Sequence, residues 1–325
     1  MSCETIDHCL LLRKRLNDNA KCVNQSEYPG FFASAIAING SVTPLVIKLV
    51  LITMLYALAV AVLCLYCPWA TLSVSPFEYA GLVMGLVLVF RINAGYERWW
   101  EARKLWGTII YSSRNLAIIV SVYTNTSQDE TVQKIIRLIA SMPYLMRNNL
   151  RLSDSIVDVC HLLDQNTYLE LQDAEHRPAF ISTKIACLLN HLHHKGSIDH
   201  FAFMKAEESR AVILDCQGAC ERILKTPIPF VMAVKARRFI LLFLMILPFA
   251  IADIAWYVAP FITGLVAYAL YSLDQIGIEL QNPFSARNLS HLPLGDMSAK
   301  IEKNVFEIYQ KFSKNQRVEY QPFCP

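Results

Sequence analysis

Long apolar segments without charged residues alternate with charged stretches along this chain, and the pattern predicts helices that cross a membrane. Residues 49–77 and 79–90 contain no Asp, Glu, Lys or Arg. Within the first of these, Leu49–Tyr66 would span about 27 Å as a helix, close to the hydrocarbon thickness of a bilayer. Pro76–Phe90 is shorter, which suits a helix sheltered by other helices or one that continues past Arg91 into water.

A second apolar region, Phe239–Leu273, contains one charged residue, Asp253. We expect two antiparallel spans that turn near Asp253, where the side chain stays solvated although ionisable groups inside a membrane are often functional. The first begins near Pro229 and ends at Ala252, and the second covers about Ile254–Leu273. Together the two regions predict four transmembrane helices.

The lysines and arginines orient these spans, because cytoplasmic loops are enriched in both residues. Basic residues precede the first span, follow the second, precede the third and follow the fourth, whereas the connection inside each pair has none. Examples are Arg13, Arg91, Arg98, Lys235, Arg238 and Lys300. Both termini are therefore expected in the cytoplasm, with the spans in a plasma membrane or a bacterial inner membrane.

The expected organisation is a single domain over residues 1–325. We divide it into a cytoplasmic N-terminal segment, spans 1 and 2, cytoplasmic helices, spans 3 and 4 and a cytoplasmic C-terminal segment, at residues 1–42, 43–90, 91–228, 229–273 and 274–325. The cytoplasmic helices are predicted from three amphipathic faces with helical spacing. These faces are Val132, Ile135, Ile136, Ile139 and Met142; Ile181, Ile185, Leu188, Leu189 and Leu192; and Ile213, Cys216, Cys220 and Leu224. No strand pattern competes, so the predicted fold class is an all-α membrane protein.

Composition supports a membrane protein. Hydrophobic residues make up 54% of the chain and charged residues 18%, whereas a soluble domain carries about 25% charged residues. The net charge of +3 is too small to indicate a nucleic-acid partner, so the expected partner is the lipid bilayer. The ten cysteines are scattered over segments expected in the membrane or the cytosol, where thiols stay reduced.

The second span has two different faces. Gly81 and Gly85 are spaced i, i+4, which lets helices approach closely, whereas Tyr79, Val83 and Val87 form an apolar stripe on the opposite face. In a ring of identical helices the glycines would face neighbouring helices and the stripe would line an axial pore, whose apolar wall can gate ions by dewetting. The alternative is an ordinary packed or lipid-facing helix.

Glu78 is the acidic residue at the start of this span. In a ring it would place one carboxylate per subunit near the outer mouth and favour cations. The alternative is structural, because Ser75, Pro76 and Glu78 match a capping box at a helix start.

The charged stretch after the second span resembles the signature that follows the pore-lining helix of bestrophins, above all of their bacterial homologues. Three further blocks resemble the same family in the same order, and the similarity runs from about residue 40 to residue 305. The blocks are RINAGYERWWEARKLWG at 91–107, CERI at 220–223 with TPIPF at 226–230, LQNPF at 280–284 and LPL at 292–294. This resemblance implies a homopentameric ion channel with four membrane segments per subunit and a long cytoplasmic vestibule.

The resemblance also implies roles for particular residues. The hydrophobic neck of the family maps to Tyr79, Val83 and Val87, or one turn away, with Tyr and Val where relatives often have Phe or Ile. A lower constriction formed shortly after a cytoplasmic proline maps to Phe180 or Ile181. The conducted species are small monovalent ions: the family's namesakes pass chloride, and bacterial relatives include members that pass cations. The apolar neck leaves this choice open.

No cofactor or metal is expected. The acidic calcium cluster that eukaryotic bestrophins carry after NPF is replaced here by residues 285–291, which hold one cation and no carboxylate. The runner-up function is a membrane-bound metal-dependent enzyme that uses His191, His193 and His194, with Cys187 nearby. A third is a scaffold or receptor without conductance. The chain has no dinucleotide, P-loop, zincin or hydrolase motif, so an ion channel that is not an enzyme is the favoured function.

Overall fold

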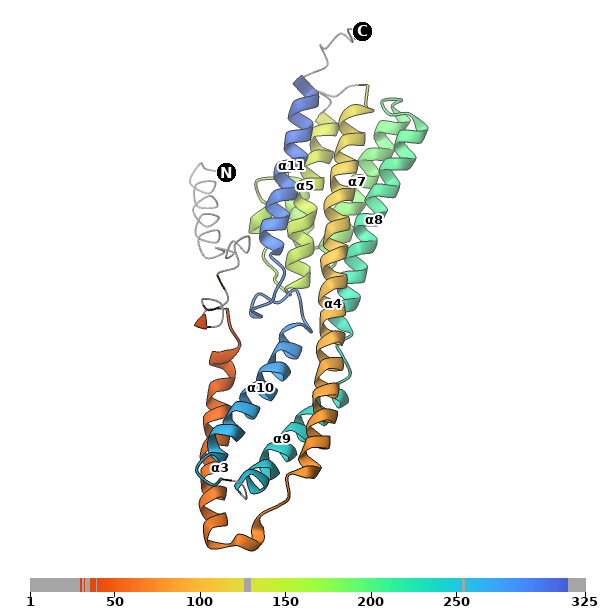
Figure 1. The fold of residues 1–325 in the computed structure, drawn as a ribbon. Coiled ribbons are helices and arrows are strands. Elements are labelled where there is room, and N and C mark those ends of the chain that lie inside the picture. Colours follow the sequence, from red (N-terminus) through yellow and green to blue (C-terminus); the bar gives the residue numbers. More distant parts are fainter. Residues whose placement is uncertain are drawn as a thin grey trace, which may run out of the picture. The chain divides into compact units, whose positions relative to one another are not determined.

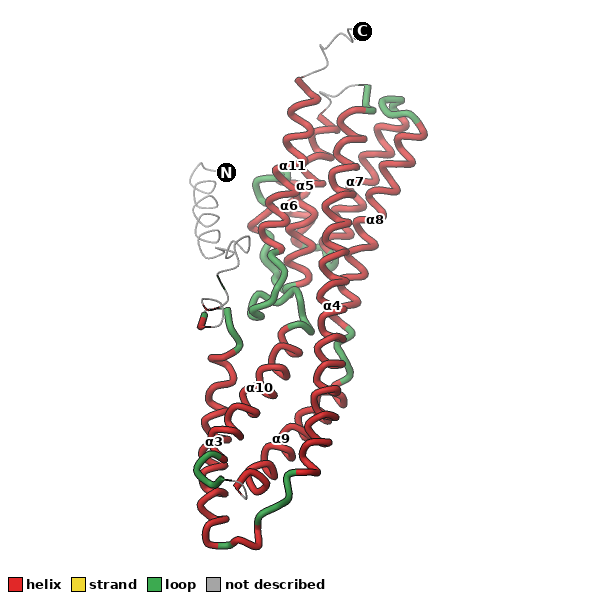
Figure 2. The backbone as a smooth tube through the Cα atoms, in the orientation of Figure 1, coloured by secondary structure: helices red, strands yellow, loops and turns green. Residues whose placement is uncertain are grey.

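The structure, a computed structural model, describes residues 30, 32, 36–38, 40–125, 130–252 and 255–314. Throughout this part the chain forms helices joined by loops, without a β-strand (Figure 1, Figure 2). The all-helical class predicted from the sequence is therefore confirmed. Asp253 and the N-terminal basic residues, Arg13 among them, lie outside the described residues.

Prolines mark several helix ends, among them the stop predicted at Thr226-Pro227. The helix Thr43–Tyr66 has a proline in its first turn. The helix His200–Lys225 ends just before Thr226, because the proline that follows Thr226 disfavours a helical conformation there. The helices are α3 (Thr43–Tyr66), α4 (Ser75–Val122), α5 (Glu130–Leu150), α6 (Gln165–Gln172), α7 (Arg177–His194), α8 (His200–Lys225), α9 (Phe230–Ala252), α10 (Ala259–Glu279) and α11 (Leu294–Lys314), with short 3-10 turns η1 (Pro68–Ala70) and η2 (Val157–Val159).

The chain divides into two compact units, which we describe separately. The membrane unit comprises the described residues up to Glu101 together with Lys225–His291, so it holds α3, the first part of α4, α9 and α10. The helical body comprises Ala102–Leu224, apart from residues 126–129, and the described residues from Leu292 onward. It holds the rest of α4, α5 to α8 and α11.

In the membrane unit, α3, α9 and α10 contact one another. Side chains from these helices and α4 form one buried apolar cluster: Ala61, Met84, Leu88, Ile240, Leu244, Leu247, Ile251, Ala259 and Ala267. Outside this cluster the unit exposes many large apolar side chains, for example Leu55 on α3 and Leu265 on α10. An exposed apolar surface of this extent is typical of a protein embedded in lipid.

Three described helices are long and apolar enough to cross a membrane: α3, α4 and α10. The helix α4 continues through the charged stretch to Val122. A helix satisfies its own backbone hydrogen bonds, so it can pass from an apolar into a charged segment without a break. The helix α9 is not among the three; its first half carries Lys235, Arg237 and Arg238. The fourth span remains a prediction.

In the helical body, α5 contacts both α7 and α11. All five residues of the face predicted on α5 are buried, from Val132 to Met142. The faces predicted on α7 and α8 are buried apart from Leu188 and Leu224, which are half-buried. The amphipathic pattern therefore identified the core of this unit.

Candidate functional site

The helix α4 starts at Ser75, one residue before the start predicted at Pro76. Ser75 and Glu78 are both exposed, and the backbone N–H of Phe77 donates to the Val74 carbonyl at 2.9 Å. Among the described residues Glu78 forms no side-chain hydrogen bond or ion pair, so the reciprocal bonds of a capping box are missing. The carboxylate of Glu78 lies in the first turn, where a negative charge favours the helix N-terminus.

One face of this segment packs within its own chain. Met84 and Leu88 are each 1% exposed in the apolar cluster, and the rings of Phe77 and Phe243 meet edge to face at 6.1 Å. A Cβ added at Gly81 would lie 3.8 Å from Phe243, whereas one at Gly85 would meet nothing within 4 Å. Gly81 therefore faces α9 of its own chain, and only the Gly85 position is open to a neighbouring helix.

The predicted stripe lies on the exposed part of the helix. The exposed fraction falls along it, from 73% at Tyr79 to 52% at Val83 and 39% at Val87. A second set of apolar side chains is exposed at least as well: Leu82, Leu86 and Phe90, at 75%, 55% and 62%.

Helix geometry separates these two stripes. At about 100° per residue, Leu82, Leu86 and Phe90 lie within about 40° of the direction opposite Met84 and Leu88. Tyr79 shares this direction, but Val83 and Val87 turn away from it by about 60° and 100°. The stripe of Leu82, Leu86 and Phe90, here called the outward stripe, is therefore the face of α4 that points away from the buried cluster of its own chain.

Three charged side chains meet where α4, α9 and α10 leave the apolar region. Arg91 on α4 donates to one oxygen of Asp274 on α10, and Arg237 on α9 donates from Nε to the other oxygen at 3.1 Å. Arg91 is 6% exposed and the Asp274 side chain 12%. A buried ion pair offsets its loss of hydration only when its charged atoms are well aligned. The charge triad, named here as Arg91, Arg237 and Asp274, therefore restricts how the three helices can pack.

Close packing accompanies the charge triad. A Cβ added at Gly95 would lie 3.1 Å from Cβ of Leu280 and 3.4 Å from the Gly277 carbonyl oxygen, and one at Gly277 would lie 3.6 Å from the Arg91 side chain. Glycines at these positions therefore let α4 and α10 approach closely.

Arg98 joins three of the sequence blocks. Its Nη1 donates to the Thr226 carbonyl at 2.6 Å and its Nε to the Gln281 carbonyl at 3.2 Å. The neighbouring Trp99 donates from Nε1 to the Ser290 carbonyl at 2.8 Å. The blocks RINAGYERWW, TPIPF and LQNPF are thus in contact in the membrane unit.

The loop after α10 is organised by Glu279. The Leu289 backbone N–H donates to Glu279 Oε2 at 2.6 Å, and Asn288 Nδ2 donates to the carbonyls of Glu279 and Asn282 at 3.1 and 2.9 Å. The Glu279 carboxylate, 7% exposed, is therefore engaged by the protein's own backbone. Hydrogen bonds from within the chain thus hold the start of this loop against the end of α10.

The cytoplasmic constriction residues differ in their surroundings. Ile181 is fully buried within its own chain, on the apolar face of α7, and its role at a constriction stays a prediction. Phe180 is half-buried, with the Lys184 ammonium 5.4 Å above its ring. Phe201 near the start of α8 is 85% exposed, the highest value among the aromatic side chains that the structure describes in this unit.

The histidine cluster does not form a metal site. His193 stacks on Phe203 with ring centroids 4.7 Å apart and lies 5.5 Å from His200. No group of three or more His, Cys, Asp or Glu side chains that could hold a metal ion occurs in the part of the chain that the structure describes. His191, His193 and His194 therefore give the metal-enzyme alternative no support.

Comparison with known protein families matches residues 23–307 to the family described as bacterial/fungal bestrophin protein. A voltage-dependent anion channel-forming protein of Synechocystis is 30% identical over 274 residues, which cover 83% of this chain and 89% of that relative. The voltage-dependent anion channel-forming protein YneE of Escherichia coli K12 is 30% identical over 284 residues, covering 83% of this chain and 88% of YneE.

Solved structures agree with the sequence relatives. A crystal structure of a bacterial bestrophin homologue from Klebsiella pneumoniae has a TM-score of 0.75 and 26% identity, and the match covers 81% of this chain and 98% of that one. A crystal structure of a membrane protein matches with a TM-score of 0.76 and 26% identity, over 81% of this chain and 98% of that one.

Proposed function

This chain belongs to the bacterial/fungal bestrophin family, and we propose that it forms an anion channel in which five identical subunits surround a central pore. The observation that carries the proposal is the exposed apolar face of α4 opposite Met84 and Leu88. An apolar face directed away from its own subunit suits a narrow wall around an axis, where dewetting can gate ions. Relatives that carry anion channel-forming names support the choice of anion.

The proposed topology has four spans, with α9 as the third. Its apolar half after Arg238 is short, but the neighbouring α3 and α10 pack against it, which suits a helix sheltered from lipid. Basic residues at its start place that end in the cytoplasm by the positive-inside rule. Both termini are then cytoplasmic, and in a bacterium the membrane is the inner one.

The proposed neck lies on α4 between Tyr79 and Phe90. Tyr79, Val83 and Val87 are the wall derived from the sequence, and the outward stripe is the wall favoured by the packing of α4. The two share one helix surface and differ by a rotation of α4 about its axis. We assign the narrowest part to Leu86 and Phe90, because both point opposite to the buried face.

Three further positions, one acidic and two aromatic, complete the proposal. Glu78 lies one residue before Tyr79 and would bring carboxylates to the outer mouth, which favours cations and would oppose anion selectivity. In the body, Phe180 keeps its role as a candidate for the lower constriction, and the exposed Phe201 is a second candidate.

Reconstitution tests this function. We expect purified protein to have a native mass of five times the 36.9 kDa chain and to release chloride from loaded liposomes. Leu86→Arg places a charge in the proposed wall and should change the flux, whereas Leu55→Arg on the exposed surface of α3 controls for a charge at a lipid-facing position. A particle of five chains without chloride release would contradict the proposal, as would a monomer.

A further inference from the structure

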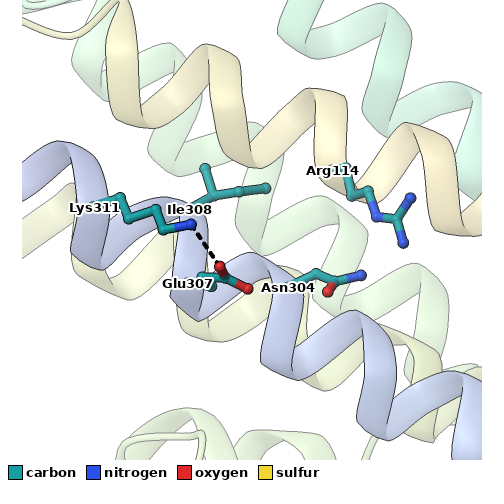
Figure 3. A pocket seen from close by; sticks show the side chains of 5 residues that line it. All are labelled: Arg114, Asn304, Glu307, Ile308 and Lys311. Atoms are coloured by element: carbon teal, nitrogen blue, oxygen red, sulfur yellow. Dashed lines mark hydrogen bonds and ion pairs between the residues drawn. The ribbon is translucent and has the colours of Figure 1, made fainter.

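A cavity of about 260 Å³ opens on the helical body between α4 and α11. Arg114 comes from α4, and Asn304, Glu307, Ile308 and Lys311 come from α11. Figure 3 shows the guanidinium of Arg114 and the amide of Asn304 on facing helices, with Glu307 and Lys311 paired beside them. Both helices belong to the same compact unit.

Two donors at this cavity have no acceptor among the described residues. Asn304 Nδ2 is buried without a hydrogen-bond partner. The half-buried guanidinium of Arg114 forms no hydrogen bond or ion pair with any described residue. A buried donor without an acceptor is unfavourable, so an acceptor that enters the cavity gains from both groups.

The one carboxylate at the cavity is already engaged. Lys311 Nζ donates to Glu307 Oε1 at 2.7 Å. This hydrogen bond, with the attraction of the ammonium charge, holds the pKa of the Glu307 carboxyl below its ordinary value, so Glu307 is ionised at neutral pH. Counting Arg114, Lys311 and Glu307, the lining carries one net positive charge.

We propose that this cavity binds a small phosphate-bearing anion, with Arg114 and Asn304 Nδ2 as donors and Lys311 as the neighbouring cation. A planar guanidinium fork matches the oxygens of phosphate and forms charge-assisted hydrogen bonds with them. The volume leaves room for more than the phosphate group, which fits a monoester as well as the free ion. The inference is independent of ion conduction, because its test measures binding.

The test titrates inorganic phosphate into the full-length protein in phosphate-free detergent by calorimetry, at constant chloride. We expect saturable binding that Arg114→Gln weakens about tenfold, the loss of one charge-assisted contact. Asn304→Leu should weaken it less, and Glu307→Gln should strengthen it because a nearby negative charge is removed. Arg137→Gln is the matched control, since Arg137 is an exposed arginine of the same unit on α5.

A second arm separates free phosphate from a lipid headgroup. Protein reconstituted in phosphatidylcholine discs with and without phosphatidic acid is titrated in the same way. Competition of phosphatidic acid with inorganic phosphate, lost in Arg114→Gln, supports the pocket with a headgroup as occupant; no competition supports a soluble phosphate. Absence of binding in the folded wild type overturns the proposal. Equal losses in Arg114→Gln and Arg137→Gln, or binding that arises only in Glu307→Gln, also overturn it.

Discussion

At the scale of single residues, Asp274 links three helices of the membrane unit. It accepts hydrogen bonds from Arg91 and Arg237 on two other helices. Arg91 is nearly inaccessible and its Nη2 has no further acceptor among the described residues. The two arginines therefore depend on one carboxylate for compensation.

Neutralising Asp274 should destabilise the membrane unit. Asp274→Asn leaves the buried Arg91 without its counter-charge, and removal of one partner of a buried pair costs about 3 kcal/mol. Thermal unfolding of the purified protein measures the loss. Arg238→Gln removes a charge from an exposed neighbour of Arg237 and should change stability by less than about 0.5 kcal/mol. Equal effects of the two variants would show that the charge triad is unimportant.

Two substitutions on α4 distinguish the alternative neck walls. We expect Leu86→Ala to raise single-channel conductance several-fold, because Leu86 points opposite to the buried face. Val83 lies at the edge of the exposed face, so Val83→Ala should raise the conductance less. Both remove apolar volume at neighbouring positions, so each controls for the other. A larger effect of Val83→Ala would return the neck to Tyr79, Val83 and Val87.

At the scale of elements, the close approach of α4 and α10 depends on glycine. In Gly95→Ala the new methyl group would lie 3.1 Å from Leu280, and such overpacking costs about 1–3 kcal/mol. Gly218→Ala is the control: Gly218 lies in α8 with nothing within 4 Å, so alanine should gain about 1 kcal/mol from its helix propensity. Chemical unfolding of both variants checks the opposite signs; a neutral Gly95→Ala would contradict the tight packing.

The sequence predicted the helices closely, whereas the neck and constriction residues stay predictions. Hydrophobic periodicity located α5, α7 and α8, because a helix with one buried face must repeat its apolar residues every turn. It also marked Ile181 as buried, in conflict with the resemblance that placed Ile181 at a constriction. Ile181 is buried in the single chain, as the periodicity predicts, and its place at a constriction stays a prediction.

The face of α4 directed away from the rest of the chain could not be predicted from the sequence, because it depends on which helices cover α4. The glycines indicate a face for close packing but not which helix packs there, and the position of Met84 and Leu88 in the core identifies the outward stripe. The location of the charge triad could be predicted in part, since Arg91, Arg237 and Asp274 each lie at an end of an apolar segment. Their pairing required the packing of three helices.

At the scale of the whole molecule, the central claim is that copies of the membrane unit enclose a pore with an anion preference. The apolar wall of α4 carries no charge to select an ion. In this proposal selectivity comes from charged groups near the ends of the wall, and Glu78 at one end favours cations. The family relationship favours the anion.

The most direct test is the reversal potential of the purified protein in a planar bilayer under a gradient of sodium chloride. We predict single-channel currents that reverse close to the equilibrium potential of chloride. A reversal close to the equilibrium potential of sodium would contradict the anion preference, and the absence of currents from a verified five-chain particle would contradict the pore itself.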